Sequence, residues 1–412
     1  MKSKINCIGI IRESRHDEAR APLSPEQINL LTKKYPKIKF IVQPSKLRSF
    51  QDINYKKNGA HISEDLNECD LILGIKEIDP KFLLEKKTYI FFSHTFKLNK
   101  ETLKNAQGTP GMDKKKLLKK IIDYRIKLID YENLRSKVGT RYLGFGRFAG
   151  VVGCYNTLNL FLKNHSTQKL KRAYEINDYV NLKKILNKVV FPKFKLLVTG
   201  DGRVANGVLE VLKETNIKKI NKYDFLNNEF EYPVFCNLKT KDYISHKNKK
   251  SFDLHHFIKY PNEYSSISIP YLKKTDVYIS AHYWDPSSPK IFEKNDLENL
   301  LNLKVIGDIT CDIDGSVPTT IRSSTIKKPN YYLDRKFFKE SKKIKNNISV
   351  MAVDNLPSEL PKESSIEFGE NIINHLLPYL IDRDDGRVLN ATITENGYFL
   401  KKYNYLNDYL NS

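Results

Sequence analysis

Two ionisable residues, Lys76 and His94, each follow a short apolar segment that has the length of a buried β-strand. Lys76 stands in Leu-Gly-Ile-Lys-Glu, and His94 ends the run Thr-Tyr-Ile-Phe-Phe-Ser-His. Open α/β sheets bind ligands at the carboxyl ends of their strands. A lysine there can have its pKa lowered by burial and neighbouring cations, and a histidine titrates near neutrality. The pair could therefore move protons in imine or carbinolamine chemistry, although on spacing alone a solvated lysine and a capping histidine are the favoured interpretation.

Four further charged residues could complete a substrate site around this pair. Arg20 and Lys97 supply fixed positive charge that is suited to holding substrate carboxylates. Glu77 and Glu132 could offset that charge and set the protonation state of the lysine. For each of the four, an ordinary surface ion pair is an equal alternative.

A third candidate stretch, residues 194–212, has the pattern of a dinucleotide-binding loop. An apolar run is followed by Gly200-x-Gly202-x-x-Ala205 and then by apolar residues at helical spacing. Gly200 allows a tight turn, Gly202 lets a pyrophosphate approach the backbone, and Ala205 lets the helix pack closely. The N–H groups at the start of that helix would face the phosphates. A plain strand–helix turn is the alternative.

Asp224 ends a second apolar segment, about 20 residues after the glycine loop, where an acidic residue contacts the adenosine ribose. A 2′-phosphate would be repelled there, which favours NAD over NADP. Nearby lysines could instead neutralise such a phosphate; these are Lys218, Lys219 and Lys222. Asp308 and Asp312 follow another expected strand and could contact the nicotinamide or a substrate amine, but a polar turn explains them equally well.

The composition indicates a folded enzyme-sized protein. The chain has 412 residues, is 40% hydrophobic and 29% charged, and carries a net charge of +22. Because its lysines are spread over the whole chain, we expect no nucleic-acid partner. Five scattered cysteines without ligand spacing indicate no metal site and a reducing compartment. We also expect no signal peptide, no membrane partner and a cytoplasmic location.

Alternating strands and helices must position these residues, which predicts an α/β fold with parallel sheets. A Gly-rich stretch, 144–153, marks the crossing into a second domain and opens a helix that runs to about residue 163. Residues 105–115 are expected to form a surface loop and 165–192 a surface excursion. The expected strands lie at 5–11, 38–42, 66–74, 88–92, 127–130, 194–198, 276–281, 304–308 and from 350.

Together these stretches resemble one enzyme family over most of the chain. The motifs, in order, are Gly-Ile-Ile-Arg-Glu, Ala-Arg-Ala-Pro-Leu-Ser-Pro, Leu-Gly-Ile-Lys-Glu, Phe-Phe-Ser-His-Thr-Phe-Lys, Leu-Ile-Asp-Tyr-Glu, Gly-Phe-Gly-Arg-Phe-Ala-Gly-Val-Val-Gly, Tyr-Trp, Gly-Asp-Ile-Thr-Cys-Asp and Val-Asp-Asn-Leu-Pro-Ser-Glu-Leu-Pro. They are similar to the lysine-forming saccharopine dehydrogenases, especially the lysine–ketoglutarate reductase half of the bifunctional lysine-degrading enzyme. The wider superfamily includes alanine dehydrogenase and transhydrogenase.

The resemblance implies two Rossmann-like domains with the active site in the cleft between them. We expect residues 1–145 plus 350–412 to form the substrate domain and residues 146–349 the NAD(P)-binding domain. By resemblance, Lys76 and His94 are the acid–base groups. The substrate contacts would be Arg20, Glu77, Lys97, Glu132 and Phe145, and the cofactor contacts Gly200, Gly202, Arg203, Val204, Asp224, Gly307, Asp308, Ile309 and Thr310.

The chain departs from the family pattern at two substrate positions. Asn99 stands near an expected Gln, and Thr140 stands where an Arg is expected, which leaves the exact oxo acid open. No second catalytic half follows, so we do not expect the bifunctional enzyme.

The leading hypothesis is an NAD(P)-dependent oxidoreductase that joins lysine and 2-oxoglutarate to saccharopine, with small amino and oxo acids as its partners. One alternative is an alanine-dehydrogenase-like amino acid dehydrogenase. Another is a non-catalytic basic protein that senses dinucleotides or binds nucleic acid.

Overall fold

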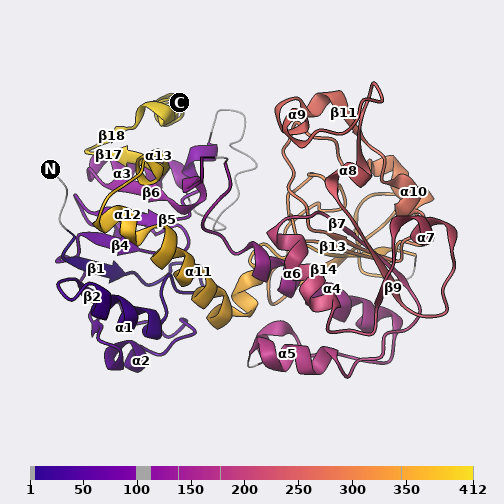
Figure 1. The fold of residues 1–412 in the computed structure, drawn as a ribbon, viewed down its shortest axis with the longest axis horizontal. Coiled ribbons are helices and arrows are strands. Elements are labelled where there is room, and N and C mark those ends of the chain that lie inside the picture. The colour runs from indigo at the N-terminus through magenta and orange to yellow at the C-terminus, as the bar shows by residue number, and fades with distance from the viewer. Residues whose placement is uncertain (1–4, 99–112, 138, 177, 345, 412) are drawn as a thin grey trace. The chain divides into compact units, whose positions relative to one another are not determined.

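Two mostly parallel β-sheets organise the chain, which the computed structural model divides into unit 1 (Met1–Phe145 and Pro361–Ser412) and unit 2 (Gly146–Leu360) (Figure 1). The structure describes residues 5–98, 113–137, 139–176, 178–344 and 346–411. The second division falls after Leu360 and not at the expected 349/350, because β16 (Ile348–Met351) pairs with the unit 2 sheet. The α/β class with two mostly parallel sheets is as predicted.

The unit 1 sheet has the strand order β18-β17-β6-β5-β4-β1-β2-β3. Its six parallel strands are β1 (Cys7–Ile10), β2 (Lys39–Val42), β3 (His61–Ile62), β4 (Leu71–Leu73), β5 (Thr88–Phe91) and β6 (Lys127–Asp130). The chain returns from unit 2 to add the antiparallel strands β17 (Thr392–Glu395) and β18 (Tyr398–Phe399). The order of the strands reverses between β1 and β4, which is where open sheets form a ligand crevice.

Seven α-helices belong to the described part of unit 1. They are α1 (Pro25–Lys34), α2 (Asp52–Lys57), α3 (Lys114–Asp123), α11 (Pro361–His375), α12 (Leu377–Ile381), α13 (Arg387–Ala391) and α14 (Leu406–Asn411). Short 3-10 helices are η1 (Pro80–Phe82), η2 (Thr95–Lys97), η4 (Tyr131–Asn133) and η9 (Lys401–Tyr403). Helix α1 begins with the predicted capping box, since Ser24 Oγ accepts from the Gln27 N–H and Gln27 Oε1 accepts from the Ser24 N–H.

The unit 2 sheet has the order β15-β14-β16-β13-β12-β7-β9-β8. Strands β7 (Lys195–Thr199), β8 (Lys218–Lys219), β9 (Val234–Leu238), β12 (Val277–Ser280), β13 (Val305–Asp308) and β16 are parallel. Strands β14 (Asn330–Leu333) and β15 (Glu340–Ser341) are antiparallel, and β10 (Ile244–His246) and β11 (Tyr264–Ser266) form a separate pair.

The α-helices of unit 2 are α4 (Gly146–His165), α5 (Tyr179–Leu186), α6 (Arg203–Leu212), α7 (Lys222–Asn227), α8 (Thr240–Tyr243), α9 (Leu254–Lys259) and α10 (Ile269–Leu272). Its 3-10 helices are η5 (Ala173–Glu175), η6 (Pro261–Glu263), η7 (Lys294–Asn299) and η8 (Leu356–Glu359). Among the described residues, we find no helix with the length and apolar character that crossing a membrane requires.

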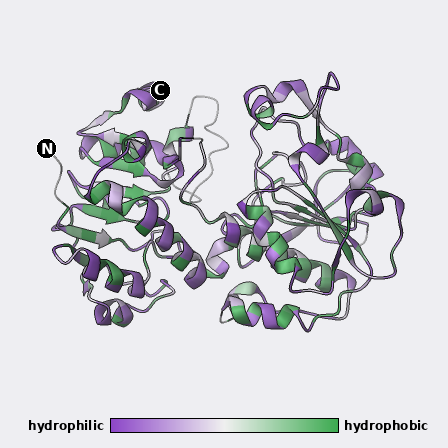
Figure 2. Cartoon of the chain, in the orientation of Figure 1, coloured by the Kyte–Doolittle hydropathy of each residue, from purple (hydrophilic) through white to green (hydrophobic). Residues whose placement is uncertain are grey.

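The parallel strands inside each sheet are mostly apolar and buried, as expected where helices cover a sheet, whereas the edge strands β3 and β8 are short and more exposed (Figure 2). Strands β7, β12 and β13 are buried along their whole length. Helix α4 is buried over most of its length and packs against α6 at Gly150, where a Cβ would lie 1.9 Å from the Val204 carbonyl oxygen. This close approach fixes α6, which begins directly after the glycine loop.

Three expectations about local structure are wrong. Asp224 does not end a strand: the strand after α6 is the two-residue β8, and Asp224 lies in α7. The 165–192 segment is not only a polar excursion, since α5 buries Leu182 and Leu186 in the unit 2 core. Lys114, which was expected to end a surface loop, opens α3 with a buried side chain. Residues 105–112 and Asn99 lie outside the described part of the chain.

Candidate active site

The proposed catalytic and substrate residues of unit 1 gather where β4, β5 and β6 end. These strands are neighbours in the sheet, and parallel pairing places their carboxyl ends at one edge. Lys76 and Glu77 follow β4, His94 and Lys97 follow β5, and Glu132 follows β6. The structure thus brings five of the predicted site residues to one edge of one sheet.

His94 and Glu77 form a buried ion pair, with His94 Nδ1 and Glu77 Oε1 2.8 Å apart. A carboxylate accepts hydrogen bonds, so Nδ1 carries the proton and Nε2 is left to exchange one with a substrate. The His94 backbone is left-handed, with φ 52° and ψ 10°. Such a conformation costs about 1–3 kcal/mol for a residue with a Cβ and is concentrated at functional sites.

Lys76 is half-buried beside this pair. Burial lowers the pKa of the Lys76 ammonium, and the Arg20 cation lowers it further, while Glu77 and Glu18 oppose the shift. A lysine whose pKa moves toward neutrality exchanges protons more readily than an exposed one. The pKa of Lys76 is thus shifted in the direction that favours proton exchange, and its acid–base role stays a prediction.

Glu132 holds two cations at the end of β6. Its Oε1 lies 2.9 Å from Lys97 Nζ and 2.5 Å from Arg141 Nη2. Burial alone would raise the pKa of the Glu132 carboxyl, but Lys97 and Arg141 outweigh it and hold the pKa below its usual value. Asp130 accepts from both the Ser93 and Glu132 N–H groups at 2.8 Å, and so aligns the ends of β5 and β6.

Arg20 is buried and paired within the loop that follows β1. Its Nε donates to Glu18 Oε1 at 2.7 Å, and its guanidinium lies 4.0 Å from the centre of the Phe145 ring. Phe145 in turn stacks on Phe368 of α11 at 4.4 Å. These contacts hold Arg20 and Phe145 as one rigid group, with Glu18 offsetting the charge.

Three residues that the sequence analysis did not single out also contact the candidate site residues of unit 1 or act on them electrostatically. Glu13 Oε1 and Oε2 accept from the Ile75 and Lys76 N–H groups at 2.6 and 2.9 Å, and burial raises the pKa of Glu13 to about 8. Lys114 is buried, and burial lowers the pKa of its ammonium, while the Glu77 carboxylate opposes this shift. Arg141 is the third. Lys114 could have been found from its spacing, since it shares the helical face of Leu117, Leu118 and Ile121.

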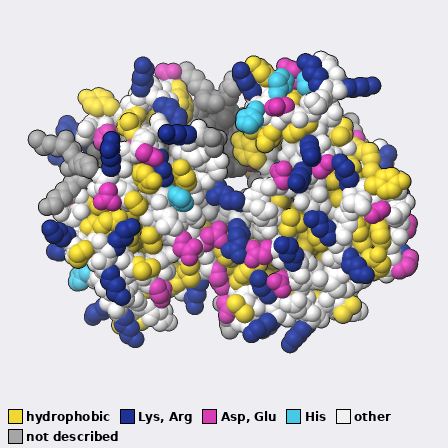
Figure 3. Space-filling model, viewed as in Figure 1, with side chains coloured by type: hydrophobic (Ala, Val, Ile, Leu, Met, Phe, Trp, Pro, Cys, Tyr) yellow, Lys and Arg dark blue, Asp and Glu magenta, His cyan; other side chains and the backbone are white. Residues whose placement is uncertain are grey.

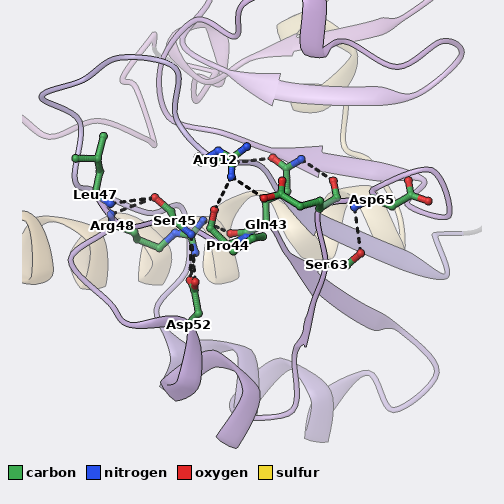
Figure 4. A network of polar contacts seen from close by, with 10 residues as sticks. Arg12, Gln43, Pro44, Ser45, Leu47, Arg48, Asp52, Ser63 and Asp65 are labelled. Carbon is green, nitrogen blue, oxygen red and sulfur yellow. Dashed lines mark hydrogen bonds and ion pairs between the residues drawn. The ribbon is translucent and has the colours of Figure 1, made fainter.

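The ends of β1, β2 and β3 are filled differently (Figure 4). Arg12 donates to the Pro44 carbonyl oxygen at 2.9 Å and to Glu64 at 3.0 Å, while Gln43 accepts from the Arg12 N–H. Arg48 Nη2 donates to the Gln43 carbonyl oxygen at 2.8 Å. This polar network connects loops to one another, so the candidate chemistry lies on the β4–β6 side of the edge.

The glycine loop of unit 2 has the geometry that a dinucleotide requires. Gly200 has a φ of 121°, and a Cβ on it would lie 2.4 Å from the Ala281 carbonyl oxygen, so only glycine fits. A Cβ on Gly202 would meet no protein atom within 4 Å, which leaves open space where a pyrophosphate approaches. Arg203 is exposed and Val204 half-buried in the first turn of α6, and a helix start next to a glycine loop is suited to binding phosphate. The residues present therefore fit the phosphates of a dinucleotide.

The predicted turn at 307–310 is held by internal bonds. Asp308 is fully buried and accepts from Ser280 Oγ at 2.8 Å and from Thr310 and Thr320 Oγ1 at 2.5 Å each. Gly307 packs against Thr157 of α4, and Ile309 against Gly153. These bonds of Asp308 stabilise the end of β13. They agree with the interpretation of this segment as a polar turn, which the sequence analysis gave as the alternative to a cofactor contact.

One group of side chains in the described residues has metal-ligand character: His246, His256 and Glu263, whose nearest atoms lie within 4.8 Å of one another. His246 Nδ1 accepts from the Asn248 N–H at 3.0 Å, so the neutral ring carries its proton on Nε2, 3.2 Å from Glu263. A metal on Nε2 would move that proton to Nδ1, against the Asn248 N–H. The group is therefore a histidine–carboxylate pair.

The described residues form an α/β protein with two mostly parallel sheets, and ionisable side chains gather at one edge of the unit 1 sheet. Residues 9–152 match the family described as alanine dehydrogenase/PNT, N-terminal domain. A solved structure of L-alanine dehydrogenase superimposes with a TM-score of 0.61, at 12% identity, over 98% of this chain and 99% of that one. At this identity the likeness concerns the fold.

The chain is 27% identical over 444 residues to the mitochondrial alpha-aminoadipic semialdehyde synthase of Mus musculus, covering 94% of this chain and 46% of that protein. It is 30% identical over 420 residues to the alpha-aminoadipic semialdehyde synthase of Arabidopsis thaliana, covering 88% and 37%. The chain thus spans less than half the length of these relatives. The chain is similar to these relatives over most of its own length, which confirms the resemblance that its motifs predicted.

Proposed function

We propose that the protein is a nicotinamide-dinucleotide-dependent oxidoreductase that joins the ε-amine of lysine to 2-oxoglutarate and reduces the resulting imine to saccharopine. The observation that carries this proposal is the Lys76–Glu77–His94 group. Two proton-exchanging side chains stand at neighbouring strand ends, one with a lowered pKa and one with its tautomer fixed by a carboxylate. The homology to the alpha-aminoadipic semialdehyde synthases supports the choice of substrates.

In this reaction the lysine amine attacks the oxo carbon and forms a carbinolamine, which then loses water. One proton must leave the attacking nitrogen, and one must reach the departing hydroxyl. Lys76 and His94 Nε2 would carry these protons, and general acid–base groups of this kind contribute about 10²–10⁴-fold. A dinucleotide held by its pyrophosphate at the glycine loop would supply the hydride that reduces the imine.

The charges at the strand ends fit an acidic oxo acid. Lys97 and Arg141 share Glu132, so two cations meet one carboxylate. Arg20, packed on Phe145, is a third cation, and Glu18 offsets its charge until a substrate carboxylate binds. Carboxylates of a substrate can bind to such cations through charge-assisted hydrogen bonds.

The test is oxidation of NADH and of NADPH by the purified chain with 2-oxoglutarate plus lysine, compared with pyruvate plus ammonia. Faster turnover with the first pair is the expected result. Turnover with pyruvate and ammonia alone would support an alanine-dehydrogenase-like enzyme, whose fold the chain shares. Dinucleotide binding without turnover on either pair would indicate a dinucleotide-sensing protein.

A further inference from the structure

Two buried thiols face one another at the amino edge of the unit 1 sheet. Cys7 is the first residue of β1, and Cys69 lies two residues before β4, the strand that pairs with β1. Their Sγ atoms are 3.4 Å apart, and both side chains are buried. The candidate site lies at the opposite, carboxyl edge of this sheet, so the pair has no part in the proposed reaction.

The pairing of the strands brings the two sulfurs together. The Asp70 N–H donates to the Cys7 carbonyl oxygen at 3.0 Å, and the Asp70 carboxylate accepts from the Cys7 N–H at 3.1 Å. Gly9 leaves room for the Cys69 side chain, because a Cβ on Gly9 would lie 3.0 Å from Cys69 Sγ. Alternate residues of a strand share a face, so Cys69 Sγ lies over the face of β1 that carries Cys7.

The separation of the sulfurs is close to that of a disulfide. A disulfide bond is about 2.05 Å long, so the two atoms need to approach one another by only about 1.4 Å. Neighbouring strands lie about 4.8 Å apart, which is within the range of Cα separations that disulfides bridge. The pair can therefore be cross-linked by small adjustments of the side chains and the backbone.

Cys7 is the more readily ionised of the two thiols. A hydrogen bond from Cys69 lowers the pKa of the Cys7 thiol, and this effect outweighs burial. The Lys39 cation lowers that pKa further, while the carboxylates of Glu68 and Asp70 oppose the shift. The thiolate is the reactive form of a cysteine. Cys7 is thus the thiol that reacts first with an oxidant, and Cys69 lies beside it as the second thiol.

The two cysteines lie close to solvent along the chain. Asn6, directly before Cys7, and Glu68, directly before Cys69, are exposed. A local opening at the start of the two strands therefore exposes the sulfurs without unfolding of the sheet, and a small oxidant can reach them. Cys154 of α4, in contrast, is enclosed in the unit 2 core.

We propose that Cys7 and Cys69 form a reversible disulfide when the protein meets a hydroperoxide. The Cys7 thiolate attacks the hydroperoxide and the O–O bond breaks; a sulfenic acid forms on Cys7, and the alkoxide leaves as an alcohol with the proton that Cys7 lost. The Cys69 sulfur then attacks the Cys7 sulfur and the S–O bond breaks, so that hydroxide leaves as water with the Cys69 proton. Two thiols are oxidised by two electrons, and the hydroperoxide is reduced to an alcohol and water.

The bond closes a loop of the chain that carries α1, β2, α2 and β3. A cross-link across so long a loop stabilises a protein mainly by restricting its unfolded state, so unit 1 should unfold at a higher temperature. Disulfides in reducing compartments are mostly transient, and a small thiol would reduce this one again. The inference goes beyond the proposed function and does not depend on it, because it requires no turnover.

The test is treatment of the reduced full chain with hydrogen peroxide, followed by alkylation of thiols under denaturing conditions and mass spectrometry. The parent should lose two of its five thiols, and trypsin should release residues 5–12 and 58–76 as one cross-linked peptide. Each part of this peptide contains one cysteine, so the linkage is unambiguous. Dithiothreitol should separate the parts and restore all five thiols. In calorimetry, oxidation should raise the midpoint of thermal unfolding of unit 1 by roughly 5–10 °C.

Two variants separate this pair from the other cysteines. Cys69→Ala should form no disulfide and should accumulate the sulfenic acid on Cys7, which dimedone traps. Cys311→Ser removes a half-buried cysteine of unit 2 and should lose two thiols as the parent does. The cross-linked peptide of the parent answers the question even if Cys69→Ala folds poorly. The inference is overturned if the folded parent keeps five thiols, if the lost thiols belong to other cysteines, or if the bond joins two chains, which doubles the mass.

Discussion

At the scale of single residues, Glu77 is the group on which the arrangement of the site depends. Its carboxylate is buried and lies 2.8 Å from His94 Nδ1. It also opposes the lowering of the pKa by burial at Lys76 and at Lys114. One buried carboxylate therefore acts electrostatically on three nitrogen bases. One of the three, His94, has a strained left-handed backbone.

We expect Lys76→Met and His94→Gln each to lower the turnover number by about 10²–10⁴-fold, because each removes a group that exchanges a proton with the substrate. Dinucleotide affinity should stay nearly unchanged, since both residues lie in unit 1 and the glycine loop lies in unit 2. Steady-state kinetics and dinucleotide titration measure the two effects. Lys81→Met, which removes a 67% exposed lysine from η1, is the control. Normal turnover in both variants would show that the proposed site is wrong.

Lys114 offers a second test at this scale. A buried ammonium that is acted on by Glu77, Lys97 and Glu132 adds positive charge where an acidic oxo acid would bind. We expect Lys114→Met to raise the KM for the oxo acid about tenfold, and Lys114→Arg to restore part of the loss, because a cation bonded to a carboxylate contributes on the order of 1.5–3 kcal/mol. Lys116→Met, on an exposed position of the same helix, should match the parent. Equal KM values in all three variants would place Lys114 outside the substrate contacts.

At the scale of elements, the packing of α4 on α6 determines where the first turn of α6 lies. Gly150→Ala would bring a Cβ within 1.9 Å of the Val204 carbonyl oxygen, and this overpacking should cost about 1–3 kcal/mol in the free energy of unfolding. Because Val204 stands in the first turn of α6, dinucleotide binding should weaken as well. Gly146→Ala on the same helix is the control, since its Cβ would meet its nearest atoms at 3.4 Å. Chemical denaturation and dinucleotide titration measure both effects; a fully stable Gly150→Ala variant would contradict the packing argument.

The elements that carry the site could largely be predicted from the sequence. The apolar runs that became β4, β5, β6 and β7 are buried on both faces, so their composition indicates them directly. Strand order could not be predicted in this way. Strand β8 consists of two exposed lysines, which carry no strand pattern. Strand β9, which the sequence analysis did not expect, pairs with β7. Pairing between segments far apart in the chain leaves no local pattern in the sequence. The expectation that Asp224 ends the strand after the glycine loop is wrong for this reason, since Asp224 lies in α7.

Side-chain partners were predictable only in part. Glu77 and Glu132 were expected to offset positive charge, and the structure pairs them with His94 and with Lys97 and Arg141. The two backbone bonds to Glu13 and the burial of Lys114 depend on how loops close over the strand ends. Such contacts arise from tertiary packing, which spacing along one element does not determine.

At the scale of the whole molecule, the net charge of +22 does not gather in one patch of the face that Figure 3 shows. Lys and Arg side chains are scattered over the face shown in Figure 3, with Asp and Glu between them. Dispersed charge of this kind favours solubility and attracts anionic ligands. Its effect on binding should therefore weaken smoothly as salt is added.

The stability of unit 2 should fall in mild acid because of His282. This residue follows β12 and is buried, with Nδ1 2.8 Å from Thr199 Oγ1 and Nε2 3.0 Å from Ser316 Oγ. Burial lowers the pKa of His282 to about 4, whereas an unfolded histidine titrates near 6.5. The unfolded state thus binds a proton at a higher pH than the folded state does. The stability that neutral, buried His282 contributes to unit 2 is fully present above about pH 6.5 and is lost as the pH falls toward 4.

We expect unit 2 to lose up to about 3 kcal/mol of its free energy of unfolding over this range, with most of the change above pH 4.5, before carboxyl groups titrate. The single tryptophan, Trp284, lies two residues from His282, so its fluorescence reports unfolding of unit 2 in denaturant. His282→Gln should flatten the pH dependence between pH 6.5 and 4.5, because glutamine does not titrate. Denaturation curves followed by Trp284 at pH 7.5, 6 and 5 measure the slope in both proteins. An equal slope in the parent and in His282→Gln would mean that another group causes the acid sensitivity and that His282 is not held neutral by its burial.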